Sequence, residues 1–215
     1  MSSSNKPIDL YFSGAENINQ LKKPIVLIGG VHGDEPEGVY LAEKSLEWLF
    51  QSSTLNLHHW ILIPCLNPDG YEQNERVNGR GVDLNRNYPS KDWSPHFDNP
   101  RYNPGSTPSS EPEIKALVSL LKELTPNLII HCHSWEPCIV CSGPPNLDAA
   151  KHLSHSSGFK IVEEIGYPTP GSLSSYAWHD NQIPVICIED EEHRDPHIVW
   201  PRFGKGIAKV FSKLA

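Results

Sequence analysis

Three short apolar runs in this chain end in side chains that can ligate a metal ion. The runs cover residues 25–28, 128–130 and 185–188, and a further apolar run covers 60–63. Short apolar runs rich in Ile and Val are typical of strands that are buried on both faces of a sheet. The carboxyl ends of parallel strands meet at one edge, which is where ligands bind in α/β proteins. The sequence therefore predicts a functional site at one edge of a buried sheet.

Helical patterns alternate with these strands. We expect helices over 35–50, 110–124 and 198–215, weaker ones over 146–157 and 171–179, and a further strand over 138–141. Pro36 and Pro112 fall in the first turn of two of these helices, where proline is tolerated. The alternation indicates an α/β fold with a mixed, largely parallel central sheet flanked by helices. A length of 215 residues fits one domain that spans residues 1–215.

A long segment from Asn67 to Ser110 shows little apolar periodicity. It is rich in Pro, Asn, Gly and Arg, and Asn and Arg are densest at 76–89. A loop of this length inside a compact domain is usually either disordered or functional. Because Asn and Arg side chains bind polar ligands, we expect this segment to contribute to the site.

Composition excludes several classes of partner. Lys plus Arg is 18 and Asp plus Glu is 26, so the net charge of −8 argues against binding to nucleic acid or to an anionic membrane. No apolar run approaches the ~18 residues of a membrane span, and the first residues lack the apolar core of a secretory signal. The five cysteines are odd in number and irregularly spaced, as expected of free thiols in a reducing compartment. Cys138 and Cys141 have CxxC spacing without a second such pair, which does not favour a zinc or redox site. We therefore expect a cytoplasmic protein.

The strand ends carry the residues of a candidate metal site. His32 and Glu35 are three residues apart and can face one ion from a single turn. His131 and His133 point to the same side if their strand continues through them. A catalytic zinc ion keeps three protein ligands and a water molecule, and it accepts imidazole and carboxylate. An isolated His-x-x-Glu is more often a solvated helix start, so the case for a metal depends on the strand ends together.

An ordered set of motifs resembles the zinc carboxypeptidases of the carboxypeptidase A type. It covers most of the chain and consists of His32-Gly-Asp-Glu35, Asn67-Pro-Asp-Gly70, Arg76-Val-Asn78, Gly81-Val-Asp-Leu-Asn-Arg-Asn87, Ser110-Glu-Pro-Glu113, His133-Ser134 and Glu189. The resemblance implies that family's fold and one Zn²⁺ ion bound by His32, Glu35 and His133. It also implies that Asp83 accepts a hydrogen bond from His32, which fixes the tautomer of the ligand. His131 departs from the family pattern, and its role as a spare ligand, a supporting group or a packed residue stays open.

The resemblance also implies the catalytic roles. Glu189 would be the general base, with Glu191 and Glu192 as close competitors in the sequence. Arg76 would polarise the scissile carbonyl and stabilise the charge that develops on it, with Arg80 as the alternative.

The resemblance further implies which residues bind the substrate. Asn85 and Arg86 would bind the terminal carboxylate, for which a planar guanidinium is well suited. Tyr167, or Tyr176 in its place, would cap the substrate. Leu173 would line the pocket for the terminal side chain.

The residues around this pocket position carry no charge. Ser174 and Ser175 follow Leu173, whereas an enzyme dedicated to C-terminal Lys or Arg usually has an acid there. We therefore expect an apolar terminal residue, or a zwitterionic one such as diaminopimelate.

These expectations describe a zinc metallocarboxypeptidase that hydrolyses the amide bond before a C-terminal residue with a free carboxylate. We expect a small peptide substrate and favour the γ-D-glutamyl–diaminopimelate bond of murein peptides, in cell-wall recycling. The alternative is an N-acyl amino acid hydrolase like succinylglutamate desuccinylase or aspartoacylase, which share a His-Gly-x-Glu start and an Asn-Arg pair. A non-catalytic binding module would have lost a metal ligand or the general base, but His32, Glu35, His133 and Glu189 are all present. The sequence leaves the oligomeric state open.

Overall fold

A central sheet organises the chain, for which the computed structural model describes residues 1–13, 16–52, 58–145 and 147–212. The sheet has seven strands within the described residues, in the order β1-β3-β2-β4-β7-β5-β6. The strands are β1 (Tyr11–Phe12), β2 (Ile25–Ile28), β3 (Trp60–Ile63), β4 (Leu128–Trp135), β5 (Cys138–Ser142), β6 (Lys160–Val162) and β7 (Val185–Glu191).

The four central strands, β3, β2, β4 and β7, are parallel. The outer strands make the sheet mixed, because β1 is antiparallel to β3 and β5 is antiparallel to β7, while β6 is parallel to β5. The predicted fold class is confirmed. Since the central strands share one direction, their carboxyl ends lie at one edge of the sheet, where the sequence predicts the site.

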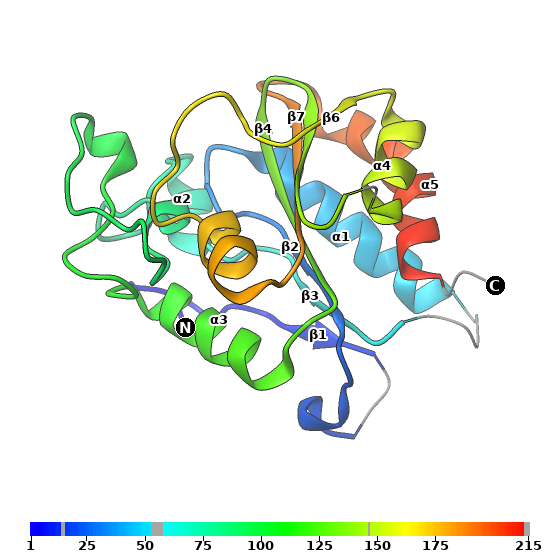
Figure 1. The fold of residues 1–215 in the computed structure, drawn as a ribbon, viewed down its shortest axis with the longest axis horizontal. Helices are drawn as coiled ribbons and strands as arrows, with labels where there is room; N and C mark the ends of the chain where they lie inside the picture. The colour runs from blue at the N-terminus through cyan, green and yellow to red at the C-terminus, as the bar shows by residue number, and fades with distance from the viewer. Residues whose placement is uncertain (14–15, 53–57, 146, 213–215) are drawn as a thin grey trace.

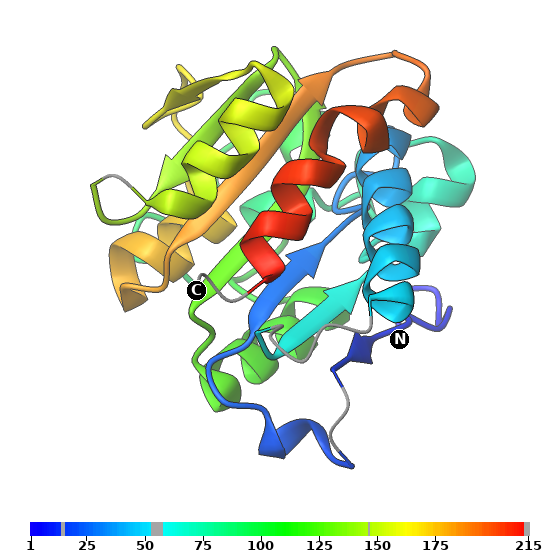
Figure 2. The same ribbon diagram turned by 90° about the vertical axis from the view of Figure 1, so that its right-hand side faces the viewer.

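Helices cover both faces of the sheet (Figure 1). Helices α1 (Pro36–Gln51), α4 (Asp148–Ser157) and α5 (Val199–Phe211) lie over the face that Figure 2 turns toward the viewer. The other face is covered by α3 (Pro112–Leu124), by a π-helical segment (Ser175–Asp180) and by the long connection that contains α2 (Pro68–Gln73). Single 3₁₀ turns lie at Ile18–Gln20, Leu84–Arg86, Pro100–Tyr102 and Pro196–Ile198. None of the helices in the described ranges combines the length and the apolar character needed to cross a membrane.

Each face of the sheet has its own apolar core, because successive side chains of a strand point to opposite faces. Val26 and Ile28 of β2 belong to the core that Ile114 of α3 completes. Leu27, between them, belongs to the core that includes Phe203 of α5. Full burial of such a side chain contributes ~1.5–3 kcal/mol. The central strands are therefore fixed from both sides, and they hold the residues at their ends in place.

The predicted helices and strands differ from the observed ones mainly in the short elements. The helices expected over 146–157 and 198–215 are α4 and α5, although residues 146 and 213–215 lie outside the described part of the chain. Within the helix expected over 171–179, helical residues begin at 173, and Ser175–Asp180 form a π-helical segment. Strands β1 and β6 and helix α2, with 2, 3 and 6 residues, were not predicted. Elements this short contain too few residues for a periodic pattern.

Close packing of α1 against β4 brings two strand ends together. A Cβ atom at Gly38 would lie 2.6 Å from the carbonyl oxygen of Cys132, so the contact requires glycine. Gly38 lies in the first turn of α1, which begins directly after Glu35. Cys132 precedes His133 on β4. The glycine contact thus brings Glu35 close to His133.

Candidate active site

Three potential metal-binding side chains converge on one point at the carboxyl edge of the sheet. Nδ1 of His32 lies 2.7 Å from Oε1 of Glu35, and Nδ1 of His133 lies 2.8 Å from Oε2 of the same carboxylate. The two Nδ1 atoms lie 2.9 Å apart. All three side chains are buried. The structure therefore brings together the three residues that the sequence predicts as metal ligands.

The Nε2 atoms of His32 and His133 each lie within hydrogen-bond distance of another side chain. Nε2 of His32 lies 3.1 Å from Oδ1 of Asp83, and Nε2 of His133 lies 2.9 Å from Nδ1 of His131. In a neutral imidazole, a proton on Nε2 leaves a lone pair on Nδ1. Two such lone pairs and a carboxylate that face one point repel each other, and a divalent cation between them reverses the repulsion. The donor atoms therefore fit Zn²⁺, which accepts nitrogen and oxygen ligands.

Glu35 remains ionised in this environment. Burial alone would raise its pKa, but in the absence of a metal ion the positive charge that His32 and His133 carry when protonated holds the pKa of the carboxyl well below its usual value. The backbone N–H of Ser134 also donates to Oε2, at 3.3 Å. A buried carboxylate with such support is ready to bind a cation.

Arg76 links two acids of the site. Its Nε donates to Oδ2 of Asp83 at 2.9 Å, and one terminal nitrogen lies 3.3 Å from Oε1 of Glu35. Burial would raise the pKa of Asp83, but Arg76 and His32 lower it far below its usual value. Asp83 is therefore a permanent acceptor for His32. Arg80, the alternative in the sequence, is exposed and lies 3.9 Å from Glu111.

Glu189 lies one strand away, paired in register with His133. Burial, together with the charge of Glu35, raises the pKa of its carboxyl to about 8. The thiol of Cys187 donates to its Oε1 at 3.0 Å. Of its two competitors in the sequence, Glu191 is paired with Arg194 at 2.7 Å, and Glu192 lies near Arg101.

Asn85 and Arg86 lie beside these residues, on the 3₁₀ turn that follows Asp83. The guanidinium of Arg86 donates to the carbonyl oxygen of Asn85 at 2.9 Å. Its central carbon lies 5.6 Å from the ring centre of Tyr102, and that of Arg76 lies 5.3 Å from the same ring. Tyr102 therefore contacts both arginines through its ring, a role that no motif in the sequence indicates.

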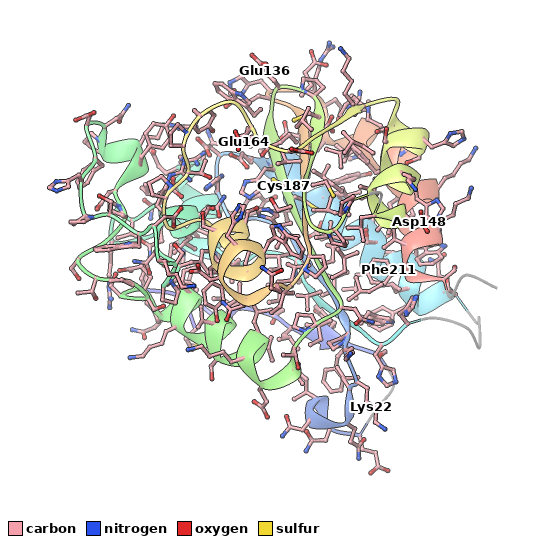
Figure 3. The ribbon with its side chains drawn as sticks, in the orientation of Figure 1. Lys22, Glu136, Asp148, Glu164, Cys187 and Phe211 are labelled. Carbon is pink, nitrogen blue, oxygen red and sulfur yellow. The ribbon has the colours of Figure 1, made fainter. Side chains whose placement is uncertain are left out.

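A cavity of ≈ 470 Å³ opens next to Glu189. Its walls include Asn85, Asp92, His131, Glu163, Glu164, Tyr167, Ser172, Ser174, Ser175 and His179. Glu163 and Glu164 follow β6 in the chain, and Figure 3 labels Glu164. Among the predicted binding residues, Asn85 and Tyr167 therefore border the cavity.

Leu173 and Tyr176 lie near this cavity but do not line its wall. Leu173 is fully buried in the core beneath it, and its backbone N–H donates to Oδ1 of Asn85 at 3.0 Å. Tyr176 is also buried and stacks on Tyr88, with ring centres 6.0 Å apart. Tyr167 is 40% exposed, so of the two tyrosines it is the one accessible to a substrate.

Sequence reasoning did not find the acids at the wall of this cavity, Asp92, Glu163 and Glu164. The carboxylate of Asp92 accepts hydrogen bonds from Ser90 at 2.6 Å and from Ser175 at 2.7 Å. Burial would raise the pKa of Asp92, but these hydrogen bonds lower it. The cavity therefore contains a negative charge, although the residues that follow Gly171 carry none. The only sequence signal was the position of Asp92 in the polar loop.

Three asparagines of that loop have a structural role. Asn67, Asn78 and Asn87 are buried. Asn67 donates to the backbone oxygen of Arg76 at 3.2 Å, and Asn87 accepts from the backbone N–H of Glu111 at 3.1 Å. The side chain of Asn78 donates to Glu111 at 2.8 Å. These motif residues hold the loop in shape, and the loop in turn positions its arginines.

Metal-dependent hydrolases combine such a ligand set with an acid that can move protons. The sequence profile of the zinc carboxypeptidase family matches residues 2–189, and the chain belongs to this family. The protein is therefore a zinc-dependent metallopeptidase, so the family and the cofactor predicted from the sequence are confirmed.

Two curated relatives of this chain are murein peptide amidases. The chain is 33% identical over 177 residues to murein peptide amidase A of Escherichia coli K12, an alignment that covers 77% of this chain and 69% of the relative. It is 29% identical over 175 residues to murein peptide amidase A of Vibrio campbellii, with 76% and 68% covered.

Solved structures show the same fold. The crystal structure of murein-tripeptide amidase from Escherichia coli O157 superposes with a TM-score of 0.81 at 25% identity, covering 100% of this chain and 90% of that one. Thrombin activatable fibrinolysis inhibitor gives a TM-score of 0.77 at 18% identity, with 97% and 67% covered, which shows the fold alone.

Proposed function

We propose that His32, Glu35 and His133 hold the zinc ion, through the two Nδ1 atoms and the carboxylate. The single observation that carries this proposal is the convergence of these three side chains: the two Nδ1 atoms lie 2.9 Å apart, and each lies within 2.8 Å of one oxygen of Glu35. A bound zinc ion supplies a Lewis acid that makes water nucleophilic near neutral pH. Asp83 keeps the proton of His32 on Nε2 and so leaves Nδ1 free to ligate.

Glu189 acts as the general base. It takes a proton from the attacking water and delivers one to the nitrogen of the leaving amine. A base works best when its pKa lies near the working pH, and burial moves the pKa of Glu189 in that direction. Glu191 is already paired with Arg194, which supports the choice of Glu189.

Arg76 faces the substrate carbonyl from within a network of charges. Its contacts with Asp83 and Glu35 fix the orientation of the guanidinium. A preorganised cation stabilises the negative charge that develops on the carbonyl oxygen.

Asn85 and Arg86 bind the terminal carboxylate of the substrate. Arg86 is buried but keeps terminal N–H groups beyond the one that it donates to Asn85. Tyr102 supports the guanidinium from one side, and Tyr167 borders the cavity where the terminal residue enters. A substrate without a free carboxylate would leave the guanidinium of Arg86 without its anionic partner.

The bond that we propose is the one between γ-D-glutamate and diaminopimelate in murein peptides. Two kinds of observation support it: the murein peptide amidases among the relatives, and the lining of the cavity. Diaminopimelate carries an ammonium and a carboxylate at the end of its side chain. Asp92 and Glu163 offer acceptors for the ammonium, and Ser174 offers a hydroxyl donor for the carboxylate.

The cellular setting follows from the same proposal. We propose one zinc peptidase domain over residues 1–215 that acts on recycled cell-wall peptides in the cytoplasm. The family match over residues 2–189 supports the single domain, and the five free cysteines fit a reducing compartment. The family match also speaks against the N-acyl amino acid hydrolase as the alternative.

A substrate screen by mass spectrometry tests this function. The screen compares murein tripeptide, ordinary C-terminal peptides and N-succinyl or N-acetyl amino acids, each with and without a chelator. We expect release of diaminopimelate from the tripeptide, and loss of that release in the chelator. Cleavage of N-acyl amino acids without cleavage of γ-glutamyl peptides would contradict the proposal.

A further inference from the structure

A second layer of polar residues lies directly beneath the proposed ligand and the proposed base. His131 precedes His133 by two positions on β4, and Cys187 precedes Glu189 by two positions on β7. Both pairs are in register across the two strands: His133 with Glu189, and His131 with Cys187. Because strand side chains alternate, residues two apart share a face. Each lower residue therefore lies under one functional residue.

Both lower residues form hydrogen bonds to the residue above them. Nδ1 of His131 lies 2.9 Å from Nε2 of His133, and Sγ of Cys187 lies 3.0 Å from Oε1 of Glu189. All four side chains are buried. Figure 3 labels Cys187, which lies in the interior of the molecule.

The direction of the hydrogen bond between the histidines follows from the zinc site. If Nδ1 of His133 ligates zinc, the proton of its ring is on Nε2, and Nδ1 of His131 must accept it. The proton of neutral His131 is then on its own Nε2, a buried atom without a hydrogen-bond partner among the described residues.

We propose that His131 and Cys187 form a positioning pair, in which His131 fixes the tautomer and orientation of His133 and Cys187 fixes the carboxylate of Glu189. His131 does for His133 what Asp83 does for His32. The two zinc-binding histidines thus have acceptors of different charge, a carboxylate for His32 and a neutral imidazole for His133. This inference rests on the roles proposed above for His133 and Glu189.

A competing interpretation uses the same atoms as a second metal site. The ligand atoms of His131, His133 and Cys187 lie within 4.8 Å of one another. An ion there would need a lone pair on Nε2 of His133, which carries a proton when Nδ1 ligates zinc. It would also need a thiolate on Cys187, whose thiol instead donates to Oε1 of Glu189. The hydrogen-bonded pair needs neither change.

The role of His131 is tested by zinc affinity. We expect His131→Leu to weaken zinc binding about 10–100-fold in a chelator competition, the usual cost of losing the acceptor of a ligating histidine. His131→Gln can still accept through its amide oxygen, so we expect it to recover part of the affinity. Zinc affinity of His131→Leu equal to that of the unaltered protein would overturn the role of His131.

The role of Cys187 is tested by turnover. Cys187→Ala leaves Glu189 without its donor and should lower kcat about threefold to tenfold, the range of one lost hydrogen bond, with zinc affinity unchanged. Cys187→Ser keeps a donor and should restore kcat. Cys132, buried on the opposite face of β4, provides the control: Cys132→Ala should lower thermal stability without moving zinc affinity or kcat. Equal kcat in Cys187→Ala and the unaltered protein would overturn the role of Cys187.

Cobalt substitution separates the pair from the second metal site. We expect one equivalent of Co²⁺ per chain and no thiolate-to-cobalt charge-transfer band. A second equivalent with such a band, lost in Cys187→Ala, would overturn the proposal. If the unaltered protein binds zinc and Glu189→Gln is inactive, a failure of these tests concerns the pair alone. If either of those two conditions fails, the proposed function is wrong.

Discussion

The Nδ1 atoms of His32 and His133 lie 2.9 Å apart although the residues are 101 positions apart in the chain. Parallel strands β2 and β4 are neighbours in the sheet, and their carboxyl ends meet at one edge. The proposed zinc site is thus a consequence of strand order. The predictions below test the roles of the residues around it.

Glu189→Gln should bind zinc normally and lose about 10²–10⁴-fold in kcat, because a neutral amide cannot accept a proton. Zinc content by atomic absorption and kcat on the murein tripeptide measure the two effects. Glu191→Gln is the matched control, since Glu191 is paired with Arg194, and it should keep its activity. Normal turnover of Glu189→Gln would move the base to another acid.

Arg86→Ala should raise KM about 10–100-fold for substrates that carry a free carboxylate, because their charge-assisted pair with the guanidinium is lost. An analogue with an amidated C-terminus lacks this pair, so its kinetic constants should change little. Arg80→Ala is the control, because Arg80 is exposed and lies 3.9 Å from Glu111. An equal loss on both substrates would remove Arg86 from carboxylate recognition.

Asp92→Asn should lower kcat/KM about tenfold for a terminal residue with a side-chain ammonium, because the amide no longer offers a charged acceptor. Norleucine at the same position has no ammonium and should be cleaved at nearly the original rate. Thermal unfolding of the variant checks that the loop survives the change, since Asp92 also accepts from Ser90 and Ser175. A similar loss for both terminal residues would indicate that the charge of Asp92 is not used in recognition.

Glu189 should destabilise the zinc-free protein as the pH rises. Its pKa is raised to about 8 in the folded chain, above the ordinary value of about 4.3 for a Glu in an unfolded chain. Between these values the folded state binds more protons than the unfolded state, so stability falls with increasing pH. In the zinc-free protein, Glu189→Gln should therefore raise Tm more at about pH 8 than at about pH 5. A Tm gain that is the same at both pH values would contradict the raised pKa.

The sequence predicted those parts of the site that adjoin regular strands. His133 and Glu189 belong to β4 and β7, whose apolar runs are visible in the sequence, and the motif with His32 follows β2. Their convergence was predictable because parallel strands align their ends. The roles of these residues, like the single-domain boundaries, stay predictions until they are measured.

The parts that were not predicted depend on contacts between distant loops. Asp92 reaches the cavity because Ser175 and Gly171, about 80 positions away, donate to it. Leu173, which the resemblance placed at the pocket, is buried in the core that also contains Tyr176 and Ala177. No local periodicity encodes either arrangement. The polar loop brings Arg76 and Asp83 to the candidate site, whereas its buried asparagines hydrogen-bond to the backbone of the loop and to Glu111.

Anomalous diffraction at the zinc edge tests the central claim most directly. Crystals of the zinc-loaded protein should show one strong peak within ligand distance of Nδ1 of His32, a carboxylate oxygen of Glu35 and Nδ1 of His133, with Glu189 nearby and unligated. A zinc peak at any other group of side chains, or no peak between these three, would contradict the account.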